Sequence, residues 1–458
     1  MDRKRGTRRN AKDRDSRPGL DLKGVQALVV GLAREGTALA RFLVERGARV
    51  TVTDAKPAEA LGDRLSALSG LELSYALGGH PLSLLAGIDI LFVSPGVPLE
   101  IPLLAEARQR GLPLSSETRL ATRLCPAPIL AITGSSGKTT TTALVGRMMK
   151  ATGRRTWVGG NIGQPLIGRL QAMTGDDAVV MELSSFQLEF FAPWPSGQGE
   201  EQAGPLFDPA GWSPPLSAVL NVTPNHLDRH GTMEAYLAAK THIMAYQRSG
   251  DAVVLGRDNP LTRALARQAR GRVLWFSMAG AVDEGAFLRG EELILRLAGQ
   301  ESVVCRRHDL QLLGDHNVAN ALAACALAGA AGAPVEAIGQ VATSFTGVEH
   351  RLELIRERAG VQWYNDSIAT TPERTVAALR AFDAPIVLLA GGRDKHLPWD
   401  EMVSLTWQKV RHLVLFGEAA GLIEKAMESR GPGLTTIHQA GDLSRAVARA
   451  ATLALPGD

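Results

Sequence analysis

The chain of 458 residues is too long for one ordinary hydrophobic core, so we expect two or three domains. Hydrophobic residues make up 45% of the chain and charged residues 21%, a balance that excludes a disordered or fibrous protein. The formal net charge is +3, but residues 1–19 contain eight Lys or Arg and three Asp, which leaves 42 basic and 44 acidic side chains elsewhere. The body of the chain therefore lacks the basic surface that binds duplex nucleic acid, and we expect no nucleic-acid partner.

The basic residues at the start of the chain are not followed by the apolar stretch of a secretory signal. We expect residues 1–19 to form a disordered arm, although contact with nucleic acid or anionic lipid stays open. The longest weakly polar stretch, Val318–Pro334, contains Asn320 and is too short to span a bilayer, so no membrane insertion is expected. The three cysteines lack metal-ligand spacing and are typical of a reducing cytoplasm.

The low aromatic content and the alternation of short strands and helices favour an α/β fold. The first unit begins with a strand at Ala27–Gly31, a turn, and a helix at Thr37–Arg46. A second strand, Arg49–Thr53, ends in Asp54, where Rossmann-like domains place an acid that contacts ribose. The turn lacks the full G-x-G-x-x-G pattern, so a nicotinamide cofactor and a purely structural βαβ unit are both open.

A second unit is expected to begin after the proline-containing segment 125–128, with a short apolar strand at Ile129–Thr133. A glycine-rich loop and a helix follow at once, which is the pattern of a polyphosphate-binding loop. Lys138 would neutralise the outer phosphates and the Thr139 hydroxyl would bind Mg²⁺. Position 132 is Ile132, so the loop is a short variant of the P-loop. Its residues are Gly134, Ser135, Ser136, Gly137, Lys138, Thr139 and Thr140.

Two strands of this unit carry polar residues at their carboxyl ends. The predicted strand Ala178–Leu183 contains Glu182, an acid that is costly in an apolar strand unless it is paired or bound to metal. Glu182 is therefore a candidate Mg²⁺ ligand, and a structural acid that caps a neighbouring helix is the alternative. The predicted strand Leu216–Thr223 precedes a polar cluster that contains His226, in the position where ligands bind in α/β domains.

The predicted helix Thr232–Gln247 carries Lys240 on its apolar face. One interpretation is that the side chain extends to the surface, with its ammonium in water. The other is a desolvated lysine of lowered pKa, which is a neutral nucleophile able to take up CO₂. The residue pattern alone leaves both open.

Residues 193–215 are rich in Pro, Gly, Ser and acidic residues, and we expect a mobile surface insertion without catalytic residues. A third α/β unit is expected from near Gly347. Its predicted strands are Val361–Asn365, Ile386–Ala390 and His412–Phe416. The polar residues at the strand ends include Asp366, Thr370 and Lys395.

Several of these segments, in this order, resemble the Mur ligases. The resemblance runs from about Val25 to the end of the chain, with the basic arm and the insertion outside it. The segment Glu182–Glu189 resembles the members that add D-glutamate. The segments that carry the resemblance are Thr133–Thr139, Gly159–Gly163, Glu182–Glu189, Asn221–Thr223, His226–Asp228, Gly314–Asn317, His350–Arg351 and Asn365–Ser367.

The resemblance implies three domains and an ATP-dependent ligase of peptidoglycan synthesis that acts as a cytoplasmic monomer. Residues 20–123 would form a Rossmann-like domain that binds the UDP moiety, without nicotinamide. Residues 124–346 would form a central P-loop ATPase-like domain, and residues 347–458 a Rossmann-like C-terminal domain that closes over ATP and the amino acid. The substrates would be UDP-N-acetylmuramoyl-L-alanine, D-glutamate and ATP, joined through an acyl phosphate that the amine of D-glutamate opens.

The same resemblance implies roles for individual residues. Catalysis would involve Lys138, Glu182, His226 and Lys240. One Mg²⁺ would lie at Thr139 and Glu182, and a second between His226 and a carbamylated Lys240, which overturns the surface interpretation of that lysine. ATP would be bound by the glycine-rich loop together with Asn320, Arg351 and Asp366. The other substrates would be bound by Arg34, Asp54, Ser94, Gly96, Asn161, Thr370 and Lys395.

The chain departs from the family pattern in two places. Ile368 stands where the family often has a lysine, which leaves Lys395 as the cation for the D-glutamate carboxylates. The chain also stops at Asp458, after the predicted helix Leu443–Leu455, where relatives continue. We therefore expect either a fragment with an incomplete third domain or an amino-acid site that is built differently. Another member of the superfamily, including folylpolyglutamate synthase, and a binding-only form without turnover are the alternatives.

Overall fold

The computed structural model describes residues 22–194, 206–392, 399–429 and 434–458. The chain divides into two compact units, one of Met1–Val304 with Leu322–Gly339 and one of Cys305–Ala321 with Gln340–Asp458. Every sheet lies among helices, so the predicted α/β class is confirmed. The basic arm at residues 1–19 lies outside the described residues. Within the described ranges, no helix has the length and apolar character needed to cross a bilayer.

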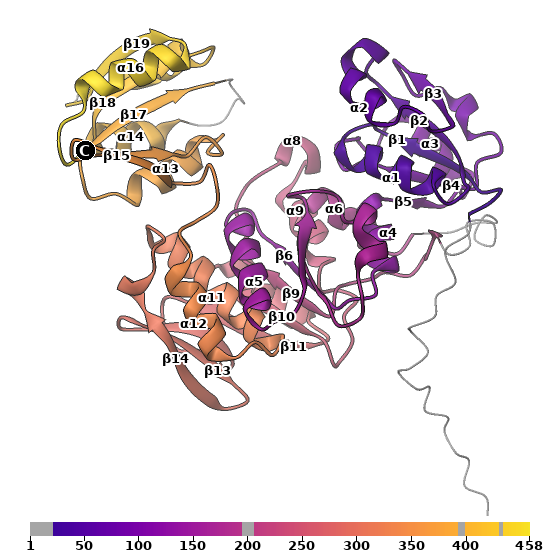
Figure 1. Cartoon of the computed structure of the whole chain (residues 1–458), viewed down its shortest axis with the longest axis horizontal. Coiled ribbons are helices and arrows are strands. Elements are labelled where there is room, and N and C mark those ends of the chain that lie inside the picture. Colours follow the sequence, from indigo (N-terminus) through magenta and orange to yellow (C-terminus); the bar gives the residue numbers. More distant parts are fainter. Residues whose placement is uncertain (1–21, 195–205, 393–398, 430–433) are drawn as a thin grey trace, which may run out of the picture. The chain divides into compact units, whose positions relative to one another are not determined.

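The first unit begins with a five-stranded parallel sheet in the order β3-β2-β1-β4-β5 (Figure 1). Its strands are β1 (Gln26–Val30), β2 (Arg49–Asp54), β3 (Leu73–Leu77), β4 (Ile90–Val93) and β5 (Leu114–Ser115). Its helices are α1 (Arg34–Val44), α2 (Gly62–Ala67), α3 (Pro102–Gln109) and α4 (Glu117–Leu124). The strands carry apolar side chains on both faces of the sheet. Side chains on one face pack against α1 and those on the other face pack against α3, so both faces of the parallel sheet are covered.

A nine-stranded sheet follows in the order β14-β13-β12-β11-β10-β9-β6-β8-β7. Its strands are β6 (Ile129–Thr133), β7 (Thr156–Gly160), β8 (Ala178–Glu182), β9 (Leu216–Val219), β10 (Ala252–Gly256), β11 (Arg272–Ser277), β12 (Gly285–Arg289), β13 (Glu292–Leu297) and β14 (Gln300–Arg306). Its helices include α5 (Lys138–Ala151), α6 (Ser185–Leu188), α8 (Leu227–His230), α9 (Met233–Thr241) and α10 (Pro260–Leu265). The strands from β7 to β12 are parallel, so their carboxyl ends share one edge of the sheet.

Strand register brings the glycine-rich loop and the acid to this edge. In the register of β6 with β8, Ile132 pairs with Glu182, and in the register of β6 with β9, Thr133 pairs with Val219. The loop leaves β6 directly after Thr133. The parallel sheet therefore places Glu182 beside the beginning of the loop.

Strand β9 and helix α9 are shorter than their sequence patterns predict. Residues after Val219 leave the sheet because their polar groups bond to the glycine-rich loop: the Ser135 N–H donates to the Asn221 carbonyl at 3.0 Å. Helix α9 ends at Thr241 in tighter turns, in which the Met244 N–H donates to the Thr241 carbonyl at 3.0 Å. The Asn221 carbonyl therefore bonds to the glycine-rich loop instead of extending β9, and the Thr241 carbonyl bonds within a tighter turn instead of extending α9.

The insertion expected at residues 193–215 differs from a surface loop wherever it is described. Leu206 and Phe207 are buried in the core of the N-terminal sheet, and Asp208 pairs with Arg123 at 3.1 Å. The expectation of a mobile surface loop is wrong for these residues, because two large apolar side chains lie within a polar composition that hid them. Residues 195–205 lie outside the described residues.

The second unit contains a two-stranded antiparallel sheet and a three-stranded parallel sheet. Its strands are β15 (Glu353–Arg358), β16 (Val361–Asn365), β17 (Ile386–Gly391), β18 (Val410–Phe416) and β19 (Thr436–Gly441). Its helices are α13 (Pro372–Arg380), α14 (Asp400–Lys409), α15 (Ala420–Glu428) and α16 (Leu443–Leu453). Helix α16 lies on one face of the larger sheet, and α13 and α14 lie on the other (Figure 1). Helices α11 (Asp315–Ala330) and α12 (Val335–Ser344) contribute residues to both units.

We predict that Gly36→Ala destabilises the protein by about 1–3 kcal/mol, since overpacking a tight contact costs that much. A Cβ at Gly36 would lie 2.0 Å from the Gly31 carbonyl oxygen, where the first turn of α1 meets the end of β1. Gly62→Ala is the matched control because nothing lies within 4 Å of a Cβ at Gly62. Urea unfolding of the three proteins measures the difference, and equal stabilities of the two variants would contradict the prediction.

Candidate active site

The glycine-rich loop joins β6 to α5 through two unusual backbone conformations. Gly134 has φ 159° and Gly137 has φ 82°, the left-handed region that favours glycine. A Cβ at Gly134 would lie 3.0 Å from the Leu220 side chain, so a larger residue would press on the neighbouring strand. Asn221 holds the loop from that strand, because its Oδ1 accepts a hydrogen bond from the Ser136 N–H at 2.9 Å. The loop is thereby fixed at the start of a 14-residue helix, where backbone N–H groups attract anions.

Two lysine ammonium groups bond to one carbonyl oxygen of this loop. The Lys138 Nζ donates to the Gly134 oxygen at 3.0 Å, and the Lys240 Nζ donates to the same oxygen at 3.0 Å. Lys240 also lies 3.4 Å from the Thr133 hydroxyl. The two predicted catalytic lysines, which are 102 positions apart in the sequence, therefore meet at the loop.

Lys240 is only 1% exposed, so the interpretation of a side chain reaching the surface is wrong. Burial lowers the pKa of its ammonium well below the usual value, and the neighbouring Lys138 cation lowers it further, while Glu182 opposes the shift. Its Nζ lies 4.6 Å from the ring centroid of Tyr236, one turn earlier on α9. A buried lysine in this setting favours the neutral amine.

Glu182 is buried at the end of β8 and is bonded on one side only. Its Oε1 accepts a hydrogen bond from the Asn161 Nδ2 at 2.8 Å, and the Arg34 Nη2 donates to the Asn161 carbonyl at 3.1 Å. Its Oε2 is buried without a hydrogen-bond partner. An unpaired carboxylate oxygen is costly in a protein interior, and a divalent cation at this position would satisfy it. The residues therefore fit a Mg²⁺ ion at Glu182.

The other predicted metal ligands belong to the same unit as this carboxylate. Thr139 is half-buried in the first turn of α5. His226 is exposed, in a left-handed conformation with φ 53°, and its ring lies 6.4 Å from that of Tyr236, which also faces Lys240. Among the residues that the structure describes, no three His, Cys, Asp or Glu side chains form a metal cluster. The candidate set thus combines one carboxylate and one imidazole with a hydroxyl and an amine.

Two of the predicted substrate residues of the N-terminal sheet, Asp54 and Ser94, form hydrogen bonds to the turn between β1 and α1. The Asp54 Oδ2 accepts a hydrogen bond from the Leu32 N–H at 2.7 Å, which closes the turn between β1 and α1. The Ser94 hydroxyl donates to the Gly31 carbonyl at 2.7 Å, and Gly96 is exposed just beyond it. Asp54 therefore positions the turn through its Oδ2 atom, in addition to any contact with ribose.

The second unit brings together part of the remaining set. The Asp366 Oδ1 accepts a hydrogen bond from the Leu352 N–H at 3.1 Å. Burial raises the pKa of Asp366, while that hydrogen bond and the nearby cations of Arg351 and Arg374 lower it. The Asn320 Nδ2 donates to the Asn317 Oδ1 at 3.1 Å in α11.

Thr370 follows Asp366 in the same turn of this unit, where its N–H donates to the Ile368 carbonyl at 2.9 Å. Lys395 lies outside the described residues.

Sequence reasoning assigned no individual role to two residues that shape the loop. Asn221 lies just beyond β9, next to β6, and the rule that ligand sites form at the carboxyl ends of parallel strands would have identified it. The Tyr236 hydroxyl lies 3.0 Å from the Ser135 hydroxyl. The sequence shows that Tyr236 lies four residues before Lys240 and therefore on the same helical face. A tyrosine in such a position is ordinarily part of a hydrophobic core, so it was given no role.

Three family descriptions match the chain in order. The N-terminal domain of the MurD-like Mur ligases matches residues 25–116, and the Mur ligase middle domain matches residues 132–194 and 208–328. The glutamate ligase domain of the Mur ligases matches residues 350–458.

Curated relatives are similar over nearly the whole chain. A UDP-N-acetylmuramoylalanine--D-glutamate ligase of Symbiobacterium thermophilum is 44% identical over 435 residues, which cover 94% of this chain and 91% of the relative. The ligase of the same name from Clostridium novyi is 40% identical over 441 residues, or 95% and 91% of the two chains. Among solved structures, a UDP-N-acetylmuramate-alanine ligase from Thermotoga maritima has a TM-score of 0.55 at 19% identity and covers 93% of this chain and 98% of its own. That likeness concerns the fold.

Proposed function

The chain belongs to the Mur ligase family, and we propose that it joins D-glutamate to UDP-N-acetylmuramoyl-L-alanine in peptidoglycan synthesis, with hydrolysis of ATP. The observation that carries the proposal is the meeting of Lys138, Lys240 and Glu182 at the carboxyl edge of one parallel sheet. Mur ligases use ATP and Mg²⁺, and this edge offers a phosphate loop, two lysines and a carboxylate oxygen without a hydrogen-bond partner. The names of the curated relatives support D-glutamate as the amino acid.

The reaction has two stages. The substrate carboxylate attacks the γ-phosphorus of ATP and gives an acyl phosphate and ADP. The amine of D-glutamate then attacks the acyl carbon, and the tetrahedral intermediate collapses to an amide with release of phosphate. Both stages depend on positioning and on the neutralisation of negative charge, which the loop amides and Lys138 provide.

The loop residues Gly134 to Thr140 would hold the ATP phosphates, with Lys138 on the outer ones. Thr139 and Glu182 would hold one Mg²⁺, and His226 and Lys240 would hold a second. The bound ions would neutralise the phosphate charges. The free Oε2 of Glu182 supports the first site.

Lys240 is proposed to carry a carbamate. Its neutral amine would attack CO₂ and lose a proton, which turns a buried cation into an anionic oxygen ligand. Burial of the side chain and the lowered pKa of its ammonium support this step, because only the neutral amine is nucleophilic. The two ammonium groups that share the Gly134 carbonyl would then become one cation and one anion.

The N-terminal turn would bind the UDP moiety through Arg34, Asp54, Ser94 and Gly96, with Asn161 at the muramoyl-alanine end. The bond between Arg34 and Asn161 supports a continuous substrate path from this turn to Glu182. In the other unit, Asn320, Arg351 and Asp366 would contact the nucleotide, and Thr370 with Lys395 the amino acid. Residues 20–123, 124–346 and 347–458 would form the three domains, in a monomer of the cytoplasm.

The experiment that tests the function measures phosphate release by the purified full chain with ATP and Mg²⁺. Release that requires both UDP-N-acetylmuramoyl-L-alanine and D-glutamate is the expected result. L-alanine or meso-diaminopimelate in place of D-glutamate should give no release above background. Release with either of those amino acids, or no turnover with D-glutamate, would contradict the proposal.

We predict that Lys138→Met lowers the rate of phosphate release by at least about 100-fold, the typical cost of removing a charge-stabilising group. Lys150→Met is the matched control, since Lys150 is exposed in the last turn of the same helix. The control should keep the rate of the unmodified protein. A Lys138→Met enzyme of normal rate would exclude the proposed phosphate contact.

We predict that Lys240→Ala is inactive and that short carboxylates such as acetate or formate partly restore its activity. The added carboxylate would occupy the space of the missing carbamate and replace its charge. Lys138→Met should show no such recovery, because it lacks a cation rather than an anion. Mass spectrometry of the unmodified protein under CO₂ should show a labile carbamate, and a bare Lys240 that supports full activity would refute the step.

A further inference from the structure

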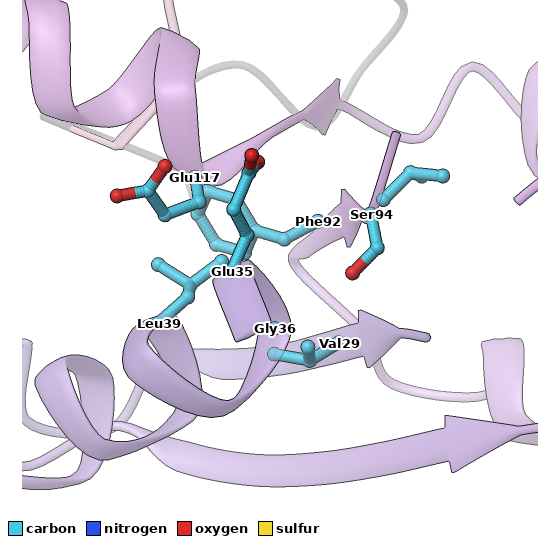
Figure 2. A pocket seen from close by; sticks show the side chains of 8 residues that line it. Val29, Glu35, Gly36, Leu39, Phe92, Ser94 and Glu117 are labelled. Atoms are coloured by element: carbon cyan, nitrogen blue, oxygen red, sulfur yellow. The ribbon is translucent and has the colours of Figure 1, made fainter. Parts of the chain in front are cut away.

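Two buried glutamates with no role in the proposed chemistry lie between the N-terminal sheet and α6. Glu35 is in the first turn of α1 and Glu117 is the first residue of α4, and they are 7% and 4% exposed. Figure 2 shows the two side chains side by side, with Phe92, Leu39 and Val29 around them. The described residues that line this hollow leave no space for a water molecule. The carboxyl groups must therefore find their hydrogen-bond partners within the protein.

One amide serves the pair, and its orientation is fixed. The Gln187 Oε1 accepts hydrogen bonds from the Ser184 N–H at 3.0 Å and from the Ser184 hydroxyl at 3.1 Å. The Gln187 Nε2 must then face the other way, where it donates to the Glu35 Oε1 at 2.7 Å and contacts the Thr118 hydroxyl at 3.1 Å. The capping box of α6 thus aims a donor at Glu35 and excludes the flipped amide.

The remaining donors are too few for two carboxylates. The Ile167 N–H donates to the Glu117 Oε1 at 3.1 Å. The Thr118 hydroxyl lies 3.3 Å from the Glu35 Oε2 and 3.4 Å from the Glu117 Oε2, and its single hydrogen can serve only one of them. One carboxyl oxygen therefore needs a hydrogen of its own.

The raised pKa values of the two glutamates also indicate that the pair keeps a proton. Burial and the charge of Glu35 raise the pKa of Glu117 to about 8, and burial raises the pKa of Glu35. The cation that acts on the pair is Arg34 of α1, which lowers both pKa values less than burial raises them. From α6 and η4 (Leu166–Ala172) the facing groups are the neutral Gln187 amide and Ile167 N–H. Two carboxylates in a dry site repel, so one proton stays.

We infer that Glu35 and Glu117 hold one proton between them, and that this shared proton makes Glu117 a positioning residue for the turn at the start of α1. Glu35 lies in the first turn of α1, directly after the turn from β1, and α6 begins shortly after Glu182, the acid at the end of β8. With the proton present, α1, α4 and α6 are joined through a hydrogen-bonded network that carries one negative charge instead of two. Its loss places two like charges between α1 and α4 and loosens the turn.

The first test needs no activity. The infrared spectrum of the full chain at about pH 7 should contain a band from a protonated carboxyl group. Ordinary carboxyl groups are ionised at that pH, so the band reports a group of raised pKa. The band should disappear when the pH is raised through about 8. Glu117→Gln mimics the protonated state, since its amide oxygen can accept from Ile167 and its NH₂ can donate to Glu35. The band should be absent from this variant and present in Glu59→Gln, a control at an exposed glutamate of the same sheet domain. A spectrum without the band in the unmodified protein would overturn the inference.

The second test measures the linkage to folding. The pKa of Glu117 is higher in the folded chain than its ordinary value of 4.5, so the folded chain holds the extra proton. The stabilisation is complete below about pH 4.5 and is lost as the pH rises through about pH 8. The Tm of the unmodified protein and of Glu59→Gln should fall between about pH 6 and about pH 9, and that of Glu117→Gln should fall less. Equal slopes in all three proteins would overturn the inference.

The third test, which rests on the proposed function, separates positioning from general stability. The KM for UDP-N-acetylmuramoyl-L-alanine should rise about tenfold per pH unit above about pH 8, with a smaller change in kcat, because a loosened turn binds substrate less well. Glu117→Gln should remove this rise. Superimposable KM profiles would refute the positioning role, while the infrared and unfolding results stand or fall independently of which substrate the protein uses.

Discussion

The carbonyl oxygen of Gly134 accepts hydrogen bonds from two lysine ammonium groups, and the arrangement of the site depends on this contact. One oxygen cannot neutralise two cations in a buried position, so the pair is stable only if one lysine gives up its proton or if anions enter. Lys240 is the lysine whose pKa is lowered well below its usual value, because it is buried while Lys138 is only partly buried.

Two polar connections fix the N-terminal sheet to the edge that carries the site. In one, Arg34 donates to the Asn161 carbonyl, and the Asn161 side chain donates to Glu182. In the other, Glu35 accepts from Gln187, whose amide oxygen caps α6 through Ser184. Both connections start in the first turn of α1 and end within a few residues of the carboxyl end of β8. A substrate held at that turn and an ion held at Glu182 would therefore be placed by the same short segments.

The parts of the site that depend on neighbours in sequence were predictable. The spacing of Gly134, Gly137 and Lys138 after an apolar strand predicts the loop, and an acid within an apolar strand predicts a special role for Glu182. The shared carbonyl was not predictable, because it depends on which strands pair and in what register. The glutamate pair was also not predictable from neighbours in sequence, because Gln187 and Glu35 are 152 positions apart. Either residue alone is typical of the exposed face of an amphipathic helix. The buried Leu206 and Phe207 were hidden in the same way, by the polar residues around them.

Burial lowers the pKa of Lys240 and raises the pKa values of Glu35 and Glu117, and in each case it disfavours the charged form of the side chain. It favours the neutral amine at Lys240 and one retained proton on the glutamate pair, so each site carries one charge fewer than full ionisation would give. A doubly negative pair at Glu35 and Glu117 would oppose an anionic nucleotide at the turn that follows β1, and a second buried cation at Lys240 would repel a divalent ion at Glu182. The reduced charge of both sites thus removes repulsion that would oppose charged ligands at these two positions.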